Sequence, residues 1–142
     1  MLWARLWGAS YAVNLVWEVL HAPLYLHFRG GPITWPVLLY AAAVDATVIT
    51  VLGWLVRRFP RRELRLPLLF LGGVTAALAI EWRALATARW AYGPFMPVVP
   101  LLNTGWSPTL QLGLTGVAAY LIAGAWTARR HDRVDGAPVP PR

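Results

Sequence analysis

Long apolar runs alternate along the chain with short polar or proline-rich stretches. A membrane-spanning helix needs about 20 predominantly apolar residues. Four runs reach that length, and they cover approximately residues 6–27, 36–56, 66–88 and 106–128. Because the linkers between them are short, neighbouring helices should be antiparallel. The pattern predicts an all-α, polytopic membrane protein, built as an antiparallel bundle of four transmembrane helices.

Two stretches outside these runs differ from them in composition. The four runs form a single membrane domain over residues 1–130, and residues 131–142 are polar and rich in proline, which predicts a disordered cytoplasmic tail. The linker at 89–108 contains four prolines and two tryptophans but hardly any charge. Since its prolines exclude a regular helix, we expect it to fold back at the outer membrane interface and cover part of the bundle.

The arginines indicate an orientation. All 13 basic residues are arginines, and the net charge is +7. Five lie within residues 57–65, and four more follow the last apolar run. Since arginines concentrate on the cytoplasmic side of membrane proteins, we predict a multi-pass protein of the inner membrane with both termini cytoplasmic. The arginines flank apolar runs instead of forming a broad basic surface, so nucleic acid is not an expected partner.

A polar stripe interrupts the first apolar run. Tyr11, Asn14, Glu18, His21 and Tyr25 are spaced by three or four residues, which places them on one face of a helix. At about 1.5 Å per residue, polar groups of the four runs reach a similar depth; they are Glu18, His21, Asp45, Glu81 and Gln111. The sequence thus predicts a buried polar layer in the outer half of the bilayer.

The carboxyl groups of this layer are the candidate catalytic residues. An ionised side chain near the centre of a membrane helix costs about 2.5–3.5 kcal/mol, so we expect Glu18, Asp45 and Glu81 to be paired, protonated or used in chemistry. A carboxylic acid that stays neutral near pH 7 can donate a proton. Amide, imidazole and aromatic groups nearby are the candidate substrate-binding residues: Asn14, His21, Tyr11, Trp17, Gln111, Trp90 and Tyr92.

Other interpretations of these residues stay open. Asn14 and Gln111 are also typical of hydrogen bonds that hold membrane helices together. Glu18 and His21 have the Glu-x-x-His spacing used in di-iron bundles, but the chain has one such pair and we predict neither a metal nor a cofactor. The absence of cysteine excludes thiolate catalysis.

Three functions are compatible with this pattern. The first is an acid–base enzyme acting on a lipid-soluble substrate, such as an isoprenoid or another lipid, that enters from the bilayer. The second is a small proton-coupled transporter working as a dimer, which makes the protein a homo-oligomer. The third is a structural or assembly subunit in which the polar layer sets helix register. Membrane lipids are expected partners in all three.

Four motifs carry a resemblance to known proteins. The segments "NLVWEVLHAPLY", "VDA", "RWAYGPFMP" and "GWSPTLQ" resemble those of a family of small bacterial integral membrane proteins. That resemblance implies a four-helix membrane fold and carries no activity. A looser one, through Asn14, Trp17, Glu18 and Asp45, is to the membrane-bound meroterpenoid cyclases. It implies that Glu18, and with it Asp45, protonates an isoprenoid epoxide or alkene.

Overall fold

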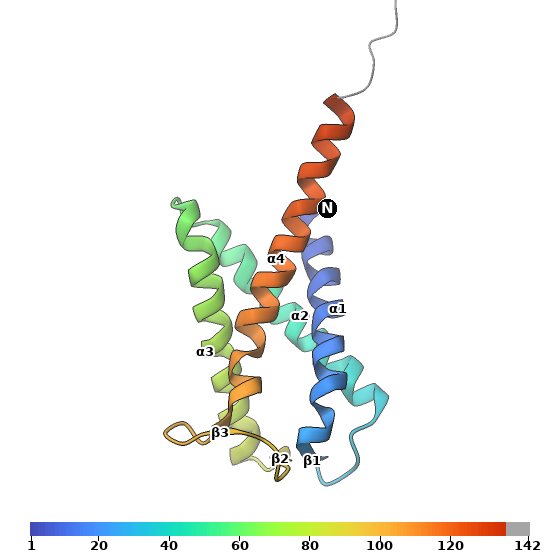
Figure 1. Ribbon diagram of the computed structural model, residues 1–142, viewed down its shortest axis with the longest axis vertical. Helices are drawn as coiled ribbons and strands as arrows, with labels where there is room; N and C mark the ends of the chain where they lie inside the picture. Colours follow the sequence, from blue (N-terminus) through green and yellow to red (C-terminus); the bar gives the residue numbers. More distant parts are fainter. Residues whose placement is uncertain (136–142) are drawn as a thin grey trace, which may run out of the picture.

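The computed structural model describes the backbone of residues 1–135 and the side chains of residues 1–124. Within these residues the protein is mostly helical. Its four long helices are α1 (Leu2–His21), α2 (Trp35–Arg57), α3 (Arg65–Ala86) and α4 (Trp106–Asp135). Helix α4 packs against α3 and α1, and α2 packs against α1 and α3. Figure 1 shows the N-terminus, the turn between α2 and α3 and the end of α4 at one end of the molecule.

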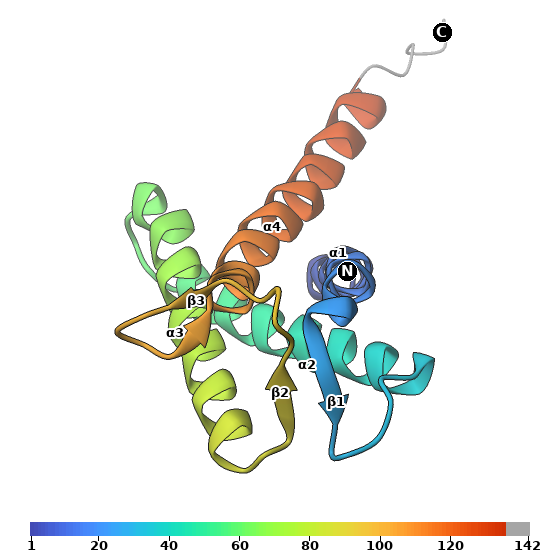
Figure 2. The same cartoon turned by 60° about the horizontal axis from the view of Figure 1, so that its bottom comes forward.

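Short strands, which the sequence did not predict, occupy the opposite end. Strand β1 (Tyr25–Phe28) pairs antiparallel with β2 (Trp90–Tyr92), and β3 (Val98–Val99) pairs with β4 (Thr104–Gly105). Figure 2 shows the first pair running side by side. Prolines exclude a helix from the linker that contains β2, β3 and β4. Pairing satisfies backbone groups that would otherwise lack partners, so the expectation of an all-α fold was incomplete.

The first helix is shorter at its carboxyl end than expected. It ends at His21, and a single 3₁₀ turn over Ala22–Leu24 leads into β1. Pro23 cannot continue the helix because it lacks a backbone N–H group. Tyr25 therefore does not share a helix face with Glu18, as its spacing suggested, and lies on β1 instead.

The other helices depart less from expectation. Helices α2 and α3 begin and end within two residues of the predicted runs. Helix α4 continues to Asp135, into the stretch predicted to be disordered. No proline or glycine interrupts the chain between Gly124 and Gly136, and glycine is a common helix stop. The rest of the predicted tail, residues 136–142, lies outside the described residues.

Two helical segments are long and apolar enough to cross a membrane: Trp35–Arg57, which is α2, and Arg62–Ala86, which contains α3. Only 22% and 17% of the residues in their most apolar stretches are buried inside the protein. Their apolar side chains therefore face mainly outward. Among the described residues, α1 and α4 do not meet the same criterion. Polar side chains such as Asn14, Glu18 and Gln111 lower their hydropathy.

Small residues let the helices approach closely. Three pairs of small residues at four-residue spacing are all buried: Gly73 with Ala77, Ala42 with Ala46, and Ala119 with Ala123. A Cβ atom added to Gly73 would lie 2.6 Å from backbone atoms of Leu112 and Gly113 on α4. The backbones of α3 and α4 therefore touch at this point, a contact typical of membrane helices.

Candidate functional site

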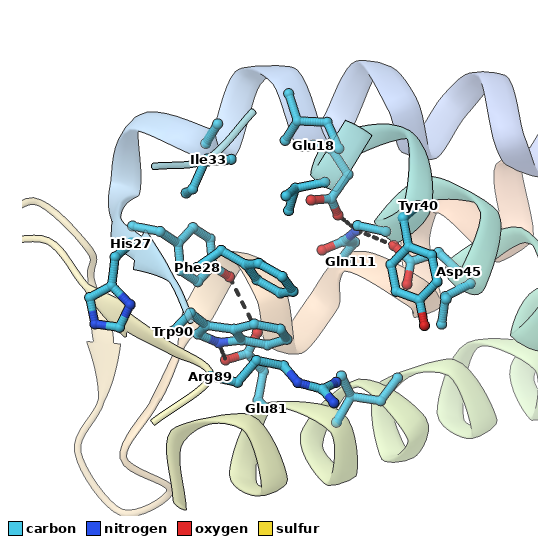
Figure 3. Close-up of a pocket in the computed structure, with 17 residues that line it drawn as sticks. Glu18, His27, Phe28, Ile33, Tyr40, Asp45, Glu81, Arg89, Trp90 and Gln111 are labelled. Carbon is cyan, nitrogen blue, oxygen red and sulfur yellow. Dashed lines mark hydrogen bonds between the residues drawn. The ribbon is translucent and has the colours of Figure 1, made fainter. Parts of the chain in front are cut away.

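Gln111, in the second turn of α4, links carboxyl groups from two other helices. Its Nε2 atom donates hydrogen bonds to Oε1 of Glu18 on α1 and to Oδ2 of Asp45 on α2, both at 2.7 Å. Because both carboxyl groups bind the same nitrogen, their oxygens lie within two hydrogen-bond lengths of each other. Figure 3 shows the three side chains meeting at one side of a cavity. We call Glu18, Asp45 and Gln111 the carboxyl–amide group.

Asn14 contacts this group on the side away from the cavity. It is completely buried, and its Oδ1 atom accepts a 3.0 Å hydrogen bond from Thr115 of α4 and a longer one, 3.4 Å, from Gln111. Its Nδ2 atom donates to the carbonyl oxygen of Ser10. Asn14 does not line the cavity. The structure therefore places Asn14 as a hydrogen-bonded link between α1 and α4. It does not place Asn14 at the cavity, although the sequence suggested that it binds substrate.

Glu81 is held separately, by the first strand pair. Its carboxylate accepts hydrogen bonds from Tyr25 on β1 at 3.2 Å, from Trp90 on β2 at 3.2 Å and from Tyr92 on β2 at 2.5 Å. The Tyr92 hydroxyl in turn accepts a 2.9 Å hydrogen bond from the backbone N–H of Gly105. Glu81 is 4% exposed. It ties both strands to α3, so it combines a place at the cavity with a structural role.

The two tyrosines remain good donors to this carboxylate. Burial, followed by the negative charge of Glu81, raises the pKa of Tyr25. Burial, followed by the hydrogen bond to Glu81, raises the pKa of Tyr92 as well. Both effects keep the phenols protonated, and only a protonated phenol can donate a hydrogen bond to Glu81.

A cavity of about 160 Å³ lies between the carboxyl–amide group and Glu81 (Figure 3). Its aromatic lining consists of Tyr25, Phe28, Tyr40 and Trp90, and aliphatic side chains of α2 and α3 complete the wall. Tyr40 is 64% exposed, so the cavity reaches the outward face of α2. Ligand sites are typically apolar with a few convergent polar groups, and this cavity has that character.

Three further predicted binding residues of α1 lie outside the cavity, as Asn14 does. His21 stacks on Trp17 with ring centroids 4.4 Å apart, and its Nδ1 atom lies 3.1 Å from the Trp17 carbonyl oxygen. Tyr11 stacks on Trp7 at 5.2 Å. Both pairs are four residues apart on α1, where side chains are neighbours. These contacts lie along α1, where the buried Nε1 atom of Trp17 has no hydrogen-bond partner among the described residues, and none of the three residues lines the cavity.

The Glu-x-x-His spacing does not assemble a metal site. Glu18 binds Gln111, whereas His21 stacks on Trp17. Over the part of the chain that the structure describes, no three or more His, Cys, Asp or Glu side chains are grouped so as to hold a metal ion.

Several cavity residues were not foreseen. Phe28 and Tyr40 line the cavity, but in the sequence each is one aromatic residue among many. Arg89 also lines it, and its sequence signal was stronger: it is an arginine in an otherwise nearly uncharged outer linker. Trp90, which was predicted, lines the cavity from β2, whereas Tyr92, also predicted, bonds to Glu81 from the same strand and does not line the cavity.

Comparison with known proteins gives no family assignment. No protein-family model, curated protein or solved structure matches the chain. The resemblances carried by the sequence motifs are neither confirmed nor refuted by this result. The functional inference therefore depends on the geometry of the site.

Proposed function

We propose that the protein is a four-span protein of the bacterial inner membrane, with both termini cytoplasmic. The outward apolar faces of α2 and α3 support membrane insertion. Helices α1 and α4 also present large apolar side chains outward, among them Leu20 at 69% and Leu121 at 53% exposure. Exposed apolar surface of this extent marks a membrane or partner interface. The polar groups of α1 and α4 point into the bundle, where a bilayer does not contact them.

Within that setting, we propose that the carboxyl–amide group performs acid–base catalysis on a lipid-soluble substrate. The observation that carries this proposal is that Glu18 and Asp45 share one cavity with predominantly apolar walls. The exposure of Tyr40 and Val44, which border the cavity on α2, supports lateral entry from the lipid. Water would be scarce in such a site, which strengthens its electrostatic interactions.

The chemistry follows from the pairing of the two carboxyl groups. Two carboxyl groups this close in apolar surroundings are more stable with one proton between them than with two negative charges. The protonated member transfers its proton to an alkene carbon or an oxygen atom of the substrate, which becomes cationic. The ring of Trp90 stabilises that positive charge. Loss of another proton from the substrate to the carboxyl pair completes an isomerisation or cyclisation without a cofactor.

Gln111 positions both members of the pair. Its amide occupies one oxygen of each carboxyl group and leaves the other oxygens for the substrate. Glu81 contributes negative charge across the cavity, but its donors from the strands leave it less free to exchange a proton. We therefore assign proton transfer to Glu18 and Asp45, and a positioning role to Glu81.

The opposite end of the bundle argues against the transporter. Leu6, Ile49 and Leu69 fill the interior between the carboxyl–amide group and the turn joining α2 to α3, and each is at most 1% exposed. Alternating access needs a path to both sides of the membrane. In the described residues, a molecule can approach the site from the α2 face but not through these three buried apolar side chains.

Solvent deuterium tests the proposal directly. Membranes containing the full chain are incubated in deuterated water with a bacterial lipid extract, and lipids are analysed by mass spectrometry. We expect one lipid species to gain carbon-bound deuterium with wild type but not with Glu18→Gln or Asp45→Asn. Glu63→Gln, in the exposed turn before α3, is the matched control and should behave as wild type. Equal labelling in all four samples would refute acid–base catalysis by this pair.

A further inference from the structure

Three arginines converge at the strand end of the molecule, beside the cavity. Arg29, Arg83 and Arg89 line a hollow of about 410 Å³, together with Thr87 and Ala88. Arg29 follows β1, Arg83 lies in the last turn of α3, and Arg89 precedes β2. The strand pairing therefore brings together positively charged groups from three separate segments.

A backbone hydrogen bond and two left-handed residues hold the segments of Arg29 and Arg89 together. The N–H group of Arg29 donates a 2.6 Å hydrogen bond to the carbonyl oxygen of Arg89. Arg29 and Ala88 adopt left-handed backbone conformations, with φ of 51° and 48°. That conformation is unfavourable for residues with a Cβ atom, and it is commonest where a structure holds functional groups in place.

The three positive charges are not neutralised by neighbouring carboxylates. Among residues 1–124, no carboxylate forms a salt bridge with any of the three guanidinium groups, although the Cζ atom of Arg29 lies 5.4 Å from the centroid of the Phe28 ring. Arginines are also disfavoured on the outer side of the membrane, where the proposed topology places this end. A bound anion would compensate the cluster.

The cluster is continuous with the carboxyl cavity. Arg89 lines both the hollow and the cavity, and Figure 3 shows it beside Trp90 on the α3 side of the cavity. Phe28 likewise lines the cavity and lies against Arg29. A molecule with a charged end in the hollow therefore has an apolar space next to it.

We propose that Arg29, Arg83 and Arg89 bind the phosphate group of a ligand whose apolar part enters the carboxyl cavity. Guanidinium groups bind phosphate oxygens in pairs of parallel hydrogen bonds. A phosphate monoester carries about −1.5 to −2 charge near pH 7, so it suits three arginines better than a singly charged diester. This inference deepens the proposed function, on which it depends for the placement of the apolar part.

Native mass spectrometry of the full chain in detergent micelles tests the site. The probes are dioleoyl phosphatidic acid, dioleoyl phosphatidylglycerol and dioleoylglycerol, which share their acyl chains and differ in head-group charge. We expect affinity to fall in that order, with at least a tenfold difference between the first and the last. Equal affinity for all three would overturn the proposal.

Arginine variants locate the effect. Arg83→Gln/Arg89→Gln should reduce phosphatidic acid binding to the level of dioleoylglycerol, whereas Arg61→Gln/Arg62→Gln, which removes equal charge at the opposite end, should not. A similar loss in both double variants would indicate general charge attraction and refute the site. Arg83→Lys/Arg89→Lys keeps the charge that favours the carboxyl end of α3; it should fold as wild type and still bind phosphatidic acid several-fold more weakly.

Two further arms separate the possible outcomes. Displacement of phosphatidic acid by millimolar inorganic phosphate would support a site that also takes free phosphate, and retention against it would support a lipid phosphate as the ligand. Glu18→Gln/Asp45→Asn should keep the preference for phosphatidic acid over dioleoylglycerol. The anion site can therefore fail while deuterium transfer by the carboxyl pair succeeds, and the reverse.

Discussion

Gln111 donates a 2.7 Å hydrogen bond to Glu18, a residue 93 positions earlier in the chain. The same nitrogen reaches Asp45, 66 positions earlier. One neutral amide thus orients two carboxyl groups that would otherwise face each other in an apolar interior. The proposed chemistry and part of the stability of the bundle depend on this single side chain.

Replacing Gln111 with alanine should destabilise the bundle. A hydrogen bond to a charged group contributes about 1.5–3 kcal/mol, so we expect Gln111→Ala to lower the free energy of unfolding by about 2–4 kcal/mol, measured by denaturation in detergent. The double variant Glu18→Gln/Gln111→Ala should lose less than the sum of the single changes because one unpaired carboxyl is gone. Strict additivity would show that the two residues do not interact.

Tyr92→Phe should weaken the attachment of the strands to α3. It removes the donor to Glu81 and the acceptor for the Gly105 N–H group. We expect a loss of about 1.5–3 kcal/mol in the free energy of unfolding. Tyr11→Phe is the matched control, since it preserves the ring that stacks on Trp7. Equal stability of the two variants would argue against Glu81 as the anchor of the strands.

The raised pKa values of Tyr25 and Tyr92 predict a loss of stability in alkali. An unfolded chain releases phenolic protons near pH 10, whereas the folded protein retains these two. Above pH 10 the unfolded state therefore binds fewer protons, and the free energy of unfolding falls as pH rises. Unfolding measured between pH 8 and 11.5 should show this decline, and Tyr25→Phe/Tyr92→Phe should flatten it. An unchanged slope in the double variant would contradict the assignment.

Gly73→Ala should force α3 and α4 apart. The added methyl group would meet backbone atoms of Leu112 and Gly113, which cannot move aside as a side chain can. Overpacking of this kind typically costs about 1–3 kcal/mol, and the midpoint of thermal unfolding should fall accordingly. Gly8→Ala on α1 has open space around it and should be neutral or slightly stabilising.

The absence of cysteine makes the proposed topology easy to test. Arg62→Cys lies in the turn between α2 and α3, and Phe95→Cys lies in the outer linker at a position that is 82% exposed. In intact spheroplasts a membrane-impermeant maleimide should label position 95 and not position 62. Labelling of both only after lysis, or the opposite pattern, would contradict the proposed orientation.

The extents of α2 and α3 and the polar face of α1 were readable from the sequence because they are local properties. The apolar runs located α2 and α3 to within two residues. The three-and-four spacing placed Asn14 and Glu18 on one face of α1, and both point into the bundle. The spacing misled at Tyr25 because Pro23 had already ended the helix.

Only the tertiary structure decided which polar groups meet. Gln111 became the centre of the carboxyl–amide group through contacts with α1 and α2, while Glu81 was drawn to the strand pair. Strand pairing likewise brought Arg29 to Arg89. A one-dimensional pattern sets how far a side chain lies along its own helix and on which face. The partner across the bundle depends on helix rotation, crossing and the path of the linkers, all of which arise from packing between distant segments.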